Sequence, residues 1–159
     1  MKIFTHDVFS FGLAAFLLSR TGLLSVQDVV MALWLTLATN YLIDVLGHRK
    51  RDGIPVRTMI THSVFTAPVW GFAVAAASAS LPYSALNMPV DRMFLLVSVA
   101  LGILLAYSHL LLDAFTEAGI FYFRHRVALM NFSYNNPVVN LLCIAIGAVL
   151  LALGLGAYA

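Results

Sequence analysis

Long apolar segments alternate with short polar ones along the whole chain. Four apolar segments, residues 26–46, 62–81, 93–112 and 137–158, have the length of about 20 residues that crossing a bilayer requires. A shorter one, residues 6–19, lacks a signal-peptide cleavage site, so we expect a retained helix. The sequence predicts an all-α, polytopic membrane helix bundle of about five transmembrane helices, the first of them short. Residues 1–159 would form a single integral-membrane domain.

The composition strengthens this interpretation and excludes other classes. Apolar residues make up 62% of the chain and charged residues 10%, with a mean hydropathy of +0.94. Soluble domains have about 45–50% apolar and about 25% charged residues, so a soluble fold and a disordered chain are both excluded. The single cysteine, Cys143, excludes an internal disulfide framework and a cysteine-rich zinc site. A net charge of +2 gives no reason to expect nucleic-acid binding.

The basic residues predict an orientation. With five spans, two basic residues, Arg20 and Arg92, fall on one side, and the other seven fall on the opposite side: Lys2, Arg49, Lys50, Arg51, Arg57, Arg124 and Arg126. Basic loops face the cytoplasm, which predicts a cytoplasmic N-terminus in a multi-pass protein of the cell inner (plasma) membrane. The run from Arg49 to Arg51 suits either headgroup anchoring or substrate binding.

Histidine and aspartate residues gather on the predicted cytoplasmic side. Asp44 and His48 are four residues apart, as are His109 and Asp113, so each pair shares a helix face. Ionisable groups at membrane depth are costly, and a divalent cation would compensate them. We predict six metal ligands: His6, Asp44, His48, His62, His109 and Asp113. A lone histidine near a helix end is more often a hydrogen-bonding residue, which is the interpretation preferred for His125.

Several of these motifs resemble a known family. Thr5-His6, Ile43-Asp44, Thr61-His62-Ser63 and the run from Ser108 to Asp113 resemble the YdjM-type inner-membrane metal-dependent hydrolases. That family is distantly similar to the zinc-dependent phospholipase C and single-strand nuclease superfamily, which is helical and hydrolyses phosphate esters. The resemblance implies that His6, Asp44, His62, His109 and Asp113 hold Zn²⁺ or another divalent metal. Asn136 and Asn140 replace the superfamily's second His-x-x-x-Glu pair, which implies one or two ions.

These expectations assign further roles. Asp44 or Asp113 would bridge two ions, and Asp44 is also a candidate catalytic carboxylate. Glu117 would be a general base, or would orient a ligand, if α-helical spacing continues from His109 through Asp113. Otherwise Glu117 is a solvated loop acid. Thr61 and Ser63 would orient ligands or cap the third helix. A phosphate-bearing lipid substrate would be bound by basic residues on the same side: Arg49, Arg51, Arg57, Arg124 and Arg126.

The sequence therefore predicts a membrane-embedded hydrolase that cleaves a lipidic phosphoester with metal-activated water and has membrane lipids as partners. Two alternatives stay open. The same histidine and aspartate layer would serve a metal-ion or proton transporter, or a structural membrane protein held together by a metal. Transporter sites commonly lie near the membrane midplane between repeats, whereas this layer lies at one face and no repeat is visible.

Overall fold

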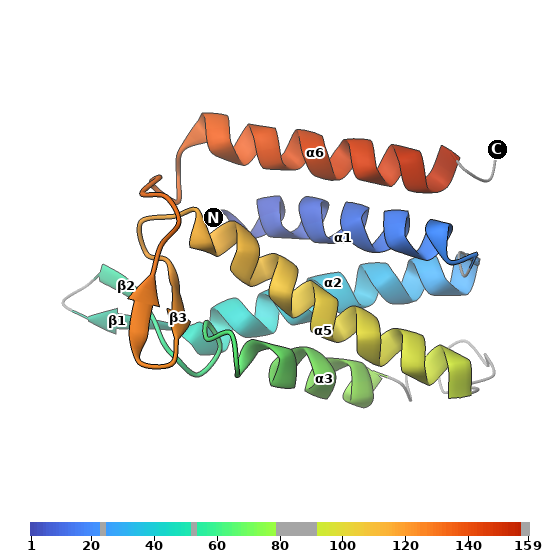
Figure 1. The fold of residues 1–159 in the computed structure, drawn as a ribbon, viewed down its shortest axis with the longest axis horizontal. Helices are drawn as coiled ribbons and strands as arrows, with labels where there is room; N and C mark the ends of the chain where they lie inside the picture. Colours follow the sequence, from blue (N-terminus) through green and yellow to red (C-terminus); the bar gives the residue numbers. More distant parts are fainter. Residues whose placement is uncertain (23–24, 52–53, 79–91, 157–159) are drawn as a thin grey trace.

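The computed structural model describes residues 1–22, 25–51, 54–78 and 92–156, and its described part contains five helices (Figure 1). They are α1 (Ile3–Arg20), α2 (Val26–Gly47), α3 (Ala67–Ser78), α5 (Arg92–Ala114) and α6 (Pro137–Gly156). The helices α2, α5 and α6 are each long and apolar enough to cross a membrane. The predicted all-α membrane bundle is therefore confirmed.

Two helices differ from their predicted bounds. Helix α1 has 18 residues and is longer than the predicted segment 6–19. Helix α3 begins at Ala67 and not at residue 62, because the preceding residues form turns: the His62 N–H donates to the Thr58 carbonyl (3.2 Å) and the Thr66 hydroxyl to the Met59 carbonyl (2.9 Å). The predicted end of this span, Leu81, lies outside the described residues. His62 therefore lies in a turn that leads into α3.

Two β-hairpins replace loops that the sequence predicted. Strand β1 (His48–Arg51) pairs antiparallel with β2 (Ile54–Arg57), and β3 (Ile120–Tyr122) pairs with β4 (His125–Val127). Strand β3 also bonds to the turn before α3, because the Phe121 N–H donates to the His62 carbonyl over 2.8 Å. Both hairpins lie at the same end of the bundle, and we call this the hairpin end (Figure 1).

The helices pack through small and aliphatic side chains. Helix α1 lies along α6 (Figure 1), and their contact includes Gly12 and Gly147, where an added Cβ at either position would overlap the other helix's backbone. Small residues let membrane helices approach closely in this way. Away from the hairpin end lies a buried apolar cluster of Ala14, Leu18, Met31, Ala32, Leu35, Ala75, Leu101 and Leu105, with the hydroxyls of Thr36, Ser78 and Ser98 buried nearby.

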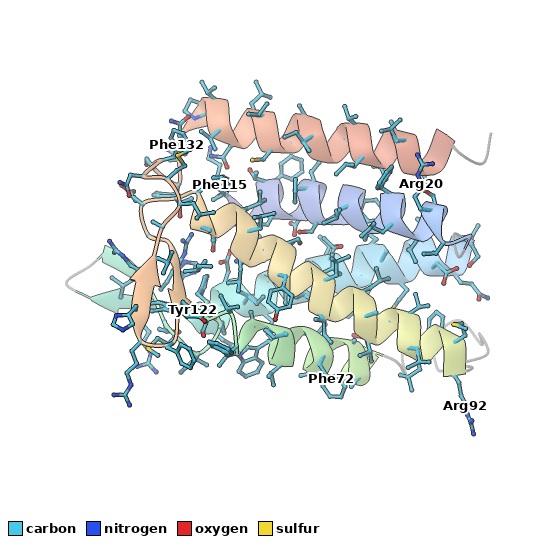
Figure 2. The ribbon with its side chains drawn as sticks, in the orientation of Figure 1. Arg20, Phe72, Arg92, Phe115, Tyr122 and Phe132 are labelled. Carbon is cyan, nitrogen blue, oxygen red and sulfur yellow. The ribbon has the colours of Figure 1, made fainter. Side chains whose placement is uncertain are left out.

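The basic residues separate between the two ends as predicted. Figure 2 shows Arg20 and Arg92 at the end opposite the hairpins. Arg49 and Arg57 lie on the hairpin of β1 and β2, and Arg126 lies on β4. The labelled aromatic residues Phe115, Tyr122 and Phe132 lie at the hairpin end as well. Which end faces the cytoplasm stays a prediction, as does the choice of membrane.

Candidate metal centre

Four side chains from three parts of the chain meet at the hairpin end. Asp44 lies in the last turn of α2, His62 in the turn before α3, and His109 and Asp113 one turn apart near the end of α5. Each offers one ligand atom, and these atoms all lie within 4.8 Å of one another. His62, His109 and Asp113 are fully buried, whereas the Asp44 side chain is 22% exposed. The cluster therefore has one solvent-facing side, at Asp44.

The separations within this cluster suit a cation better than hydrogen bonds. Asp113 Oδ2 lies 3.4 Å from His62 Nε2 and 3.3 Å from His109 Nε2, while Asp44 Oδ1 lies 3.4 Å from His109 Nε2 and 3.8 Å from His62 Nε2. Hydrogen bonds from nitrogen to oxygen are about 2.7–3.2 Å long. Ligand atoms placed tetrahedrally about 2.0–2.1 Å from zinc are about 3.3–3.4 Å apart.

The facing atoms of the cluster are also unpartnered. His62 Nε2, His109 Nε2 and Asp113 Oδ2 are buried and make no hydrogen bond within the described structure. Buried polar atoms are normally hydrogen-bonded, because an unsatisfied one costs about 1–3 kcal/mol. Three such atoms directed at one another are explained by a shared cation. The residues present therefore fit a divalent metal ion, as the sequence predicted for these four positions.

The turn that carries His62 is fixed from two sides. Strand β3 holds its backbone through Phe121, and the Thr61 hydroxyl hydrogen-bonds the His62 Nδ1 over 2.9 Å. Gly47, at the end of α2, lies so close that an added Cβ would overlap Thr61 and His62. A glycine at this position is what allows Asp44 and His62 to approach each other.

The second oxygen of Asp113 faces positive groups. Arg57 directs its guanidinium at Asp113 Oδ1 over 2.5 Å, and its other terminal nitrogen donates to the Thr116 hydroxyl over 2.9 Å. The amino group of Met1 lies 2.8 Å from the same oxygen. Asp113 thus directs Oδ2 at the candidate metal position and Oδ1 at the positively charged groups of Arg57 and Met1.

Two histidines predicted as ligands lie outside the group of four. The His6 ring stacks on His109 at 3.9 Å, and its Nε2 is 3.2 Å from Asp113 Oδ1, so it borders the group of four. Both of its ring nitrogens are buried without a hydrogen bond to the described residues, and its role as a ligand stays a prediction. His48 lies at the exposed rim, where its Nδ1 hydrogen-bonds the Asp44 carbonyl over 2.9 Å. Partial burial lowers the pKa of the His48 imidazole. His125 is exposed on β4.

The predicted orienting and catalytic residues are distributed unevenly. Thr61 contacts His62, whereas Ser63 accepts a hydrogen bond from the Phe65 N–H (3.3 Å) and so supports the turn before α3. Glu117 is exposed in a turn, because α5 ends at Ala114 and the row from His109 does not continue to it. The catalytic role of Glu117 stays a prediction.

The predicted substrate-binding arginines form two groups. Arg57 and Arg126 line one groove of about 520 Å³, together with Glu117 and Tyr134. Arg49 and Arg124 are exposed on or beside the hairpins, and the side chain of Arg51 lies outside the described residues. Arg57 alone among the described arginines also contacts a residue of the cluster.

Sequence reasoning missed two polar residues behind His109. Asn40 is fully buried in α2, and its Oδ1 lies 3.1 Å from His109 Nδ1. Its amide nitrogen donates to Asp7 Oδ1 over 2.9 Å. The signal was present, because Asn40 lies four residues before Asp44 within an apolar segment and so shares its helix face.

Comparisons with known proteins place the chain only broadly. The model of one family, described as Protein of unknown function (DUF1286), matches residues 1–112. The matched stretch includes Asp44, His62 and His109 and ends one residue before Asp113. No curated protein and no solved structure matches the chain.

Proposed function

This chain belongs to the DUF1286 family, and for it we propose a membrane-embedded, metal-dependent hydrolase that cleaves a phosphoester of a lipid or lipid-like molecule at the membrane surface. The observation that carries the proposal is the set of unpartnered atoms that His62, His109 and Asp113 direct at one another beside Asp44. The resemblance of its motifs to those of the YdjM-type hydrolases supports the same proposal.

Zinc is the ion that we propose first. Two imidazole nitrogens and two carboxylate oxygens form a typical zinc ligand set, although other divalent metals accept the same donors. We propose a single ion. A second ion bridged by Asp113 would need its Oδ1, and there it would meet the guanidinium of Arg57 at close range.

An enzymatic role is supported by access from one side. Structural metal sites are coordinatively closed, whereas catalytic ones keep a position for water or substrate. Asp44 is part-exposed and His48 lies beside it at the surface, so water or substrate would reach the ion from this rim, either by replacing the Asp44 carboxylate or by adding to the four protein ligands. When bound, the ion would polarise a phosphoryl oxygen and activate a water for hydrolysis.

The protein's own groups would hold the substrate near this rim. Arg49, on β1, and Arg57, opposite His48 on β2, surround the approach with positive charge that suits a phosphate. Arg57 would contribute through its field, because both of its terminal nitrogens already bind protein oxygens. His48, with its lowered pKa, would be largely neutral near pH 7 and able to accept a proton at the rim.

Buried polar side chains continue from the cluster toward the apolar core of the bundle, as an ion path would require. Ser10 and Ser108 share a hydrogen bond of 2.6 Å, and Thr39 is buried with an unpartnered hydroxyl. Among the described residues the next layer is mainly aliphatic, with Leu35, Leu101 and Leu105. Its buried hydroxyls, those of Thr36 and Ser98, donate to carbonyls of their own helices. We therefore prefer hydrolysis to transport.

The experiment measures metal content and turnover on the same protein. We expect about one zinc per detergent-purified chain, and metal-dependent release of phosphate or headgroup from phospholipids in mixed micelles. His109→Ala should lose both, and His125→Ala, the matched exposed histidine, should keep both. Stoichiometric metal without turnover would overturn the hydrolase. Metal uptake into liposomes would replace it with transport.

A further inference from the structure

His109 is the one histidine of the cluster whose outer nitrogen faces an amide. Its Nδ1 lies 3.1 Å from Asn40 Oδ1, and Asn40 Nδ2 lies 2.9 Å from Asp7 Oδ1. His109 and Asn40 are fully buried, and Asp7 is half-buried on α1. Three side chains from α5, α2 and α1 thus form a single line of hydrogen bonds that ends at the candidate metal position.

The carboxylate of Asp7 determines which atom donates in each hydrogen bond of this line. A carboxylate accepts hydrogen bonds and donates none, so Asp7 must face the NH₂ group of Asn40. The amide oxygen of Asn40 then faces His109, and since that oxygen is an acceptor, His109 Nδ1 must carry the proton. Neutral imidazole has one protonated nitrogen, so His109 Nε2 is left with a lone pair directed into the cluster.

The outer nitrogen of His62, the other histidine of the cluster, faces a different kind of group from that of His109. Its Nδ1 faces the hydroxyl of Thr61, and a hydroxyl can donate or accept. The Thr61 contact therefore permits either tautomer of His62, whereas the Asn40 contact permits one tautomer of His109.

We propose that Asn40 and Asp7 are positioning residues that fix the tautomer of His109 and thereby set the metal affinity of the centre. The inference rests on the proposed metal centre. Metal-bound histidines commonly donate their other N–H to such an acceptor, and loss of the acceptor costs about 10–100-fold in metal affinity. Here the acceptor is an amide, and the amide is itself oriented by an aspartate from another helix.

Exchanging the two outer residues tests the proposal. Asn40→Asp alone replaces the donor that faces Asp7 with a second carboxylate, and repulsion between the two carboxylates would move the acceptor away from His109. The double variant Asp7→Asn, Asn40→Asp restores a donor opposite an acceptor and keeps His109 Nδ1 protonated. Asn40→Leu removes the acceptor at similar size. Asn131→Leu, at an exposed asparagine in the segment before α6, is the matched control.

Zinc affinity is measured in detergent by competition with a chromophoric chelator. We expect Asn40→Leu and Asn40→Asp to bind about 10–100-fold more weakly, and Asn131→Leu to match the wild type. The double variant should return to within about threefold of the wild type, as an interaction between two contacting residues requires. Equal affinity of Asn40→Leu and wild type would overturn the proposal, as would a double variant no better than Asn40→Asp.

A second measurement separates this proposal from the metal centre. Long-range ¹H–¹⁵N spectra of the metal-free protein report which nitrogen of His109 carries the proton. At alkaline pH, where the imidazole is neutral, we expect the Nδ1–H form in the wild type and in the double variant, and a mixture in Asn40→Leu. A wild type that binds no zinc but shows the single tautomer would reject the metal centre and keep the hydrogen-bonded line. A mixed tautomer in the wild type would reject the line itself.

Discussion

The hairpin end and the opposite half of the bundle are stabilised by different interactions. At the hairpin end, buried imidazoles, carboxylates and a guanidinium are held by directional contacts, such as those of Arg57 with Asp113 and of Phe121 with His62. In the opposite half, aliphatic residues such as Leu35 and Leu105 pack without polar partners, and Gly71 and Gly102 bring α3 against α5.

These two kinds of interaction predict which residues should affect metal binding and which should affect stability alone. An apolar core tolerates exchange at a cost in packing, whereas a buried charge cluster loses its balance when one member is removed. Substitutions in the opposite half should therefore lower stability without changing metal affinity. Substitutions of the buried polar residues at the hairpin end should change both.

The largest effect is expected from Asp113→Ala. It leaves the Arg57 guanidinium buried without its carboxylate, and breaking such a pair costs about 3–5 kcal/mol. It also removes a candidate ligand, so bound zinc should fall to background. Unfolding in detergent and metal analysis measure the two losses. Asp28→Ala, at the exposed capping box of α2, is the control and should cost about 1 kcal/mol while keeping metal. Retained zinc in Asp113→Ala would contradict the ligand assignment.

Leu105→Ala should destabilise the protein by about 2–5 kcal/mol, because it opens a cavity in the fully buried apolar core. Zinc affinity of the remaining folded protein should be unchanged, since Leu105 belongs to the opposite half. The same unfolding and competition measurements apply. A clear loss of zinc affinity in this variant would show that packing in the opposite half affects the metal centre.

Gly47→Ala should cost about 1–3 kcal/mol, because its new methyl group overlaps Thr61 and His62. Moving His62 should also weaken zinc binding by about tenfold, the lower end of the loss seen when the support of a ligand is changed. Gly156→Ala is the matched control, because nothing lies within 4 Å of its added Cβ. If both variants bind zinc equally well, the close approach of α2 to the His62 turn is not needed by the centre.

The smallest effect is expected from Ser10→Ala, at the boundary between the two regions. It removes the hydrogen bond with Ser108, and such bonds between membrane helices contribute about 0.6 kcal/mol on average. Thermal unfolding should shift slightly and zinc affinity not at all. A loss of metal in this variant would extend the centre deeper into the bundle than we propose.

The sequence predicts much of this architecture because apolar length and helical spacing are local properties. The spacing of His109 and Asp113 places both on one face of α5, and the alternation of spans brings Asp44 to the same end. The start of α3 was wrong, because the turn from Thr58 to Thr66 depends on bonds to β3, which lies far along the chain. The position of Asn40 on the Asp44 face of α2 could be predicted from spacing, but its contacts with His109 and Asp7 on two other helices could not.

The bond between strand β3 and the His62 turn has a consequence for how the protein is made. Arg57 and Asp113 are separated by 56 residues, and synthesis at about 5–20 residues per second puts about 3–11 s between them. During that interval Asp44 and Arg57 have been synthesised but Asp113 has not, and the β3 segment is synthesised later still. Capture of the proposed cation would therefore come late in biogenesis, and a chain truncated before β3 would expose to quality-control proteases a charge cluster whose His62 turn lacks its bond to Phe121.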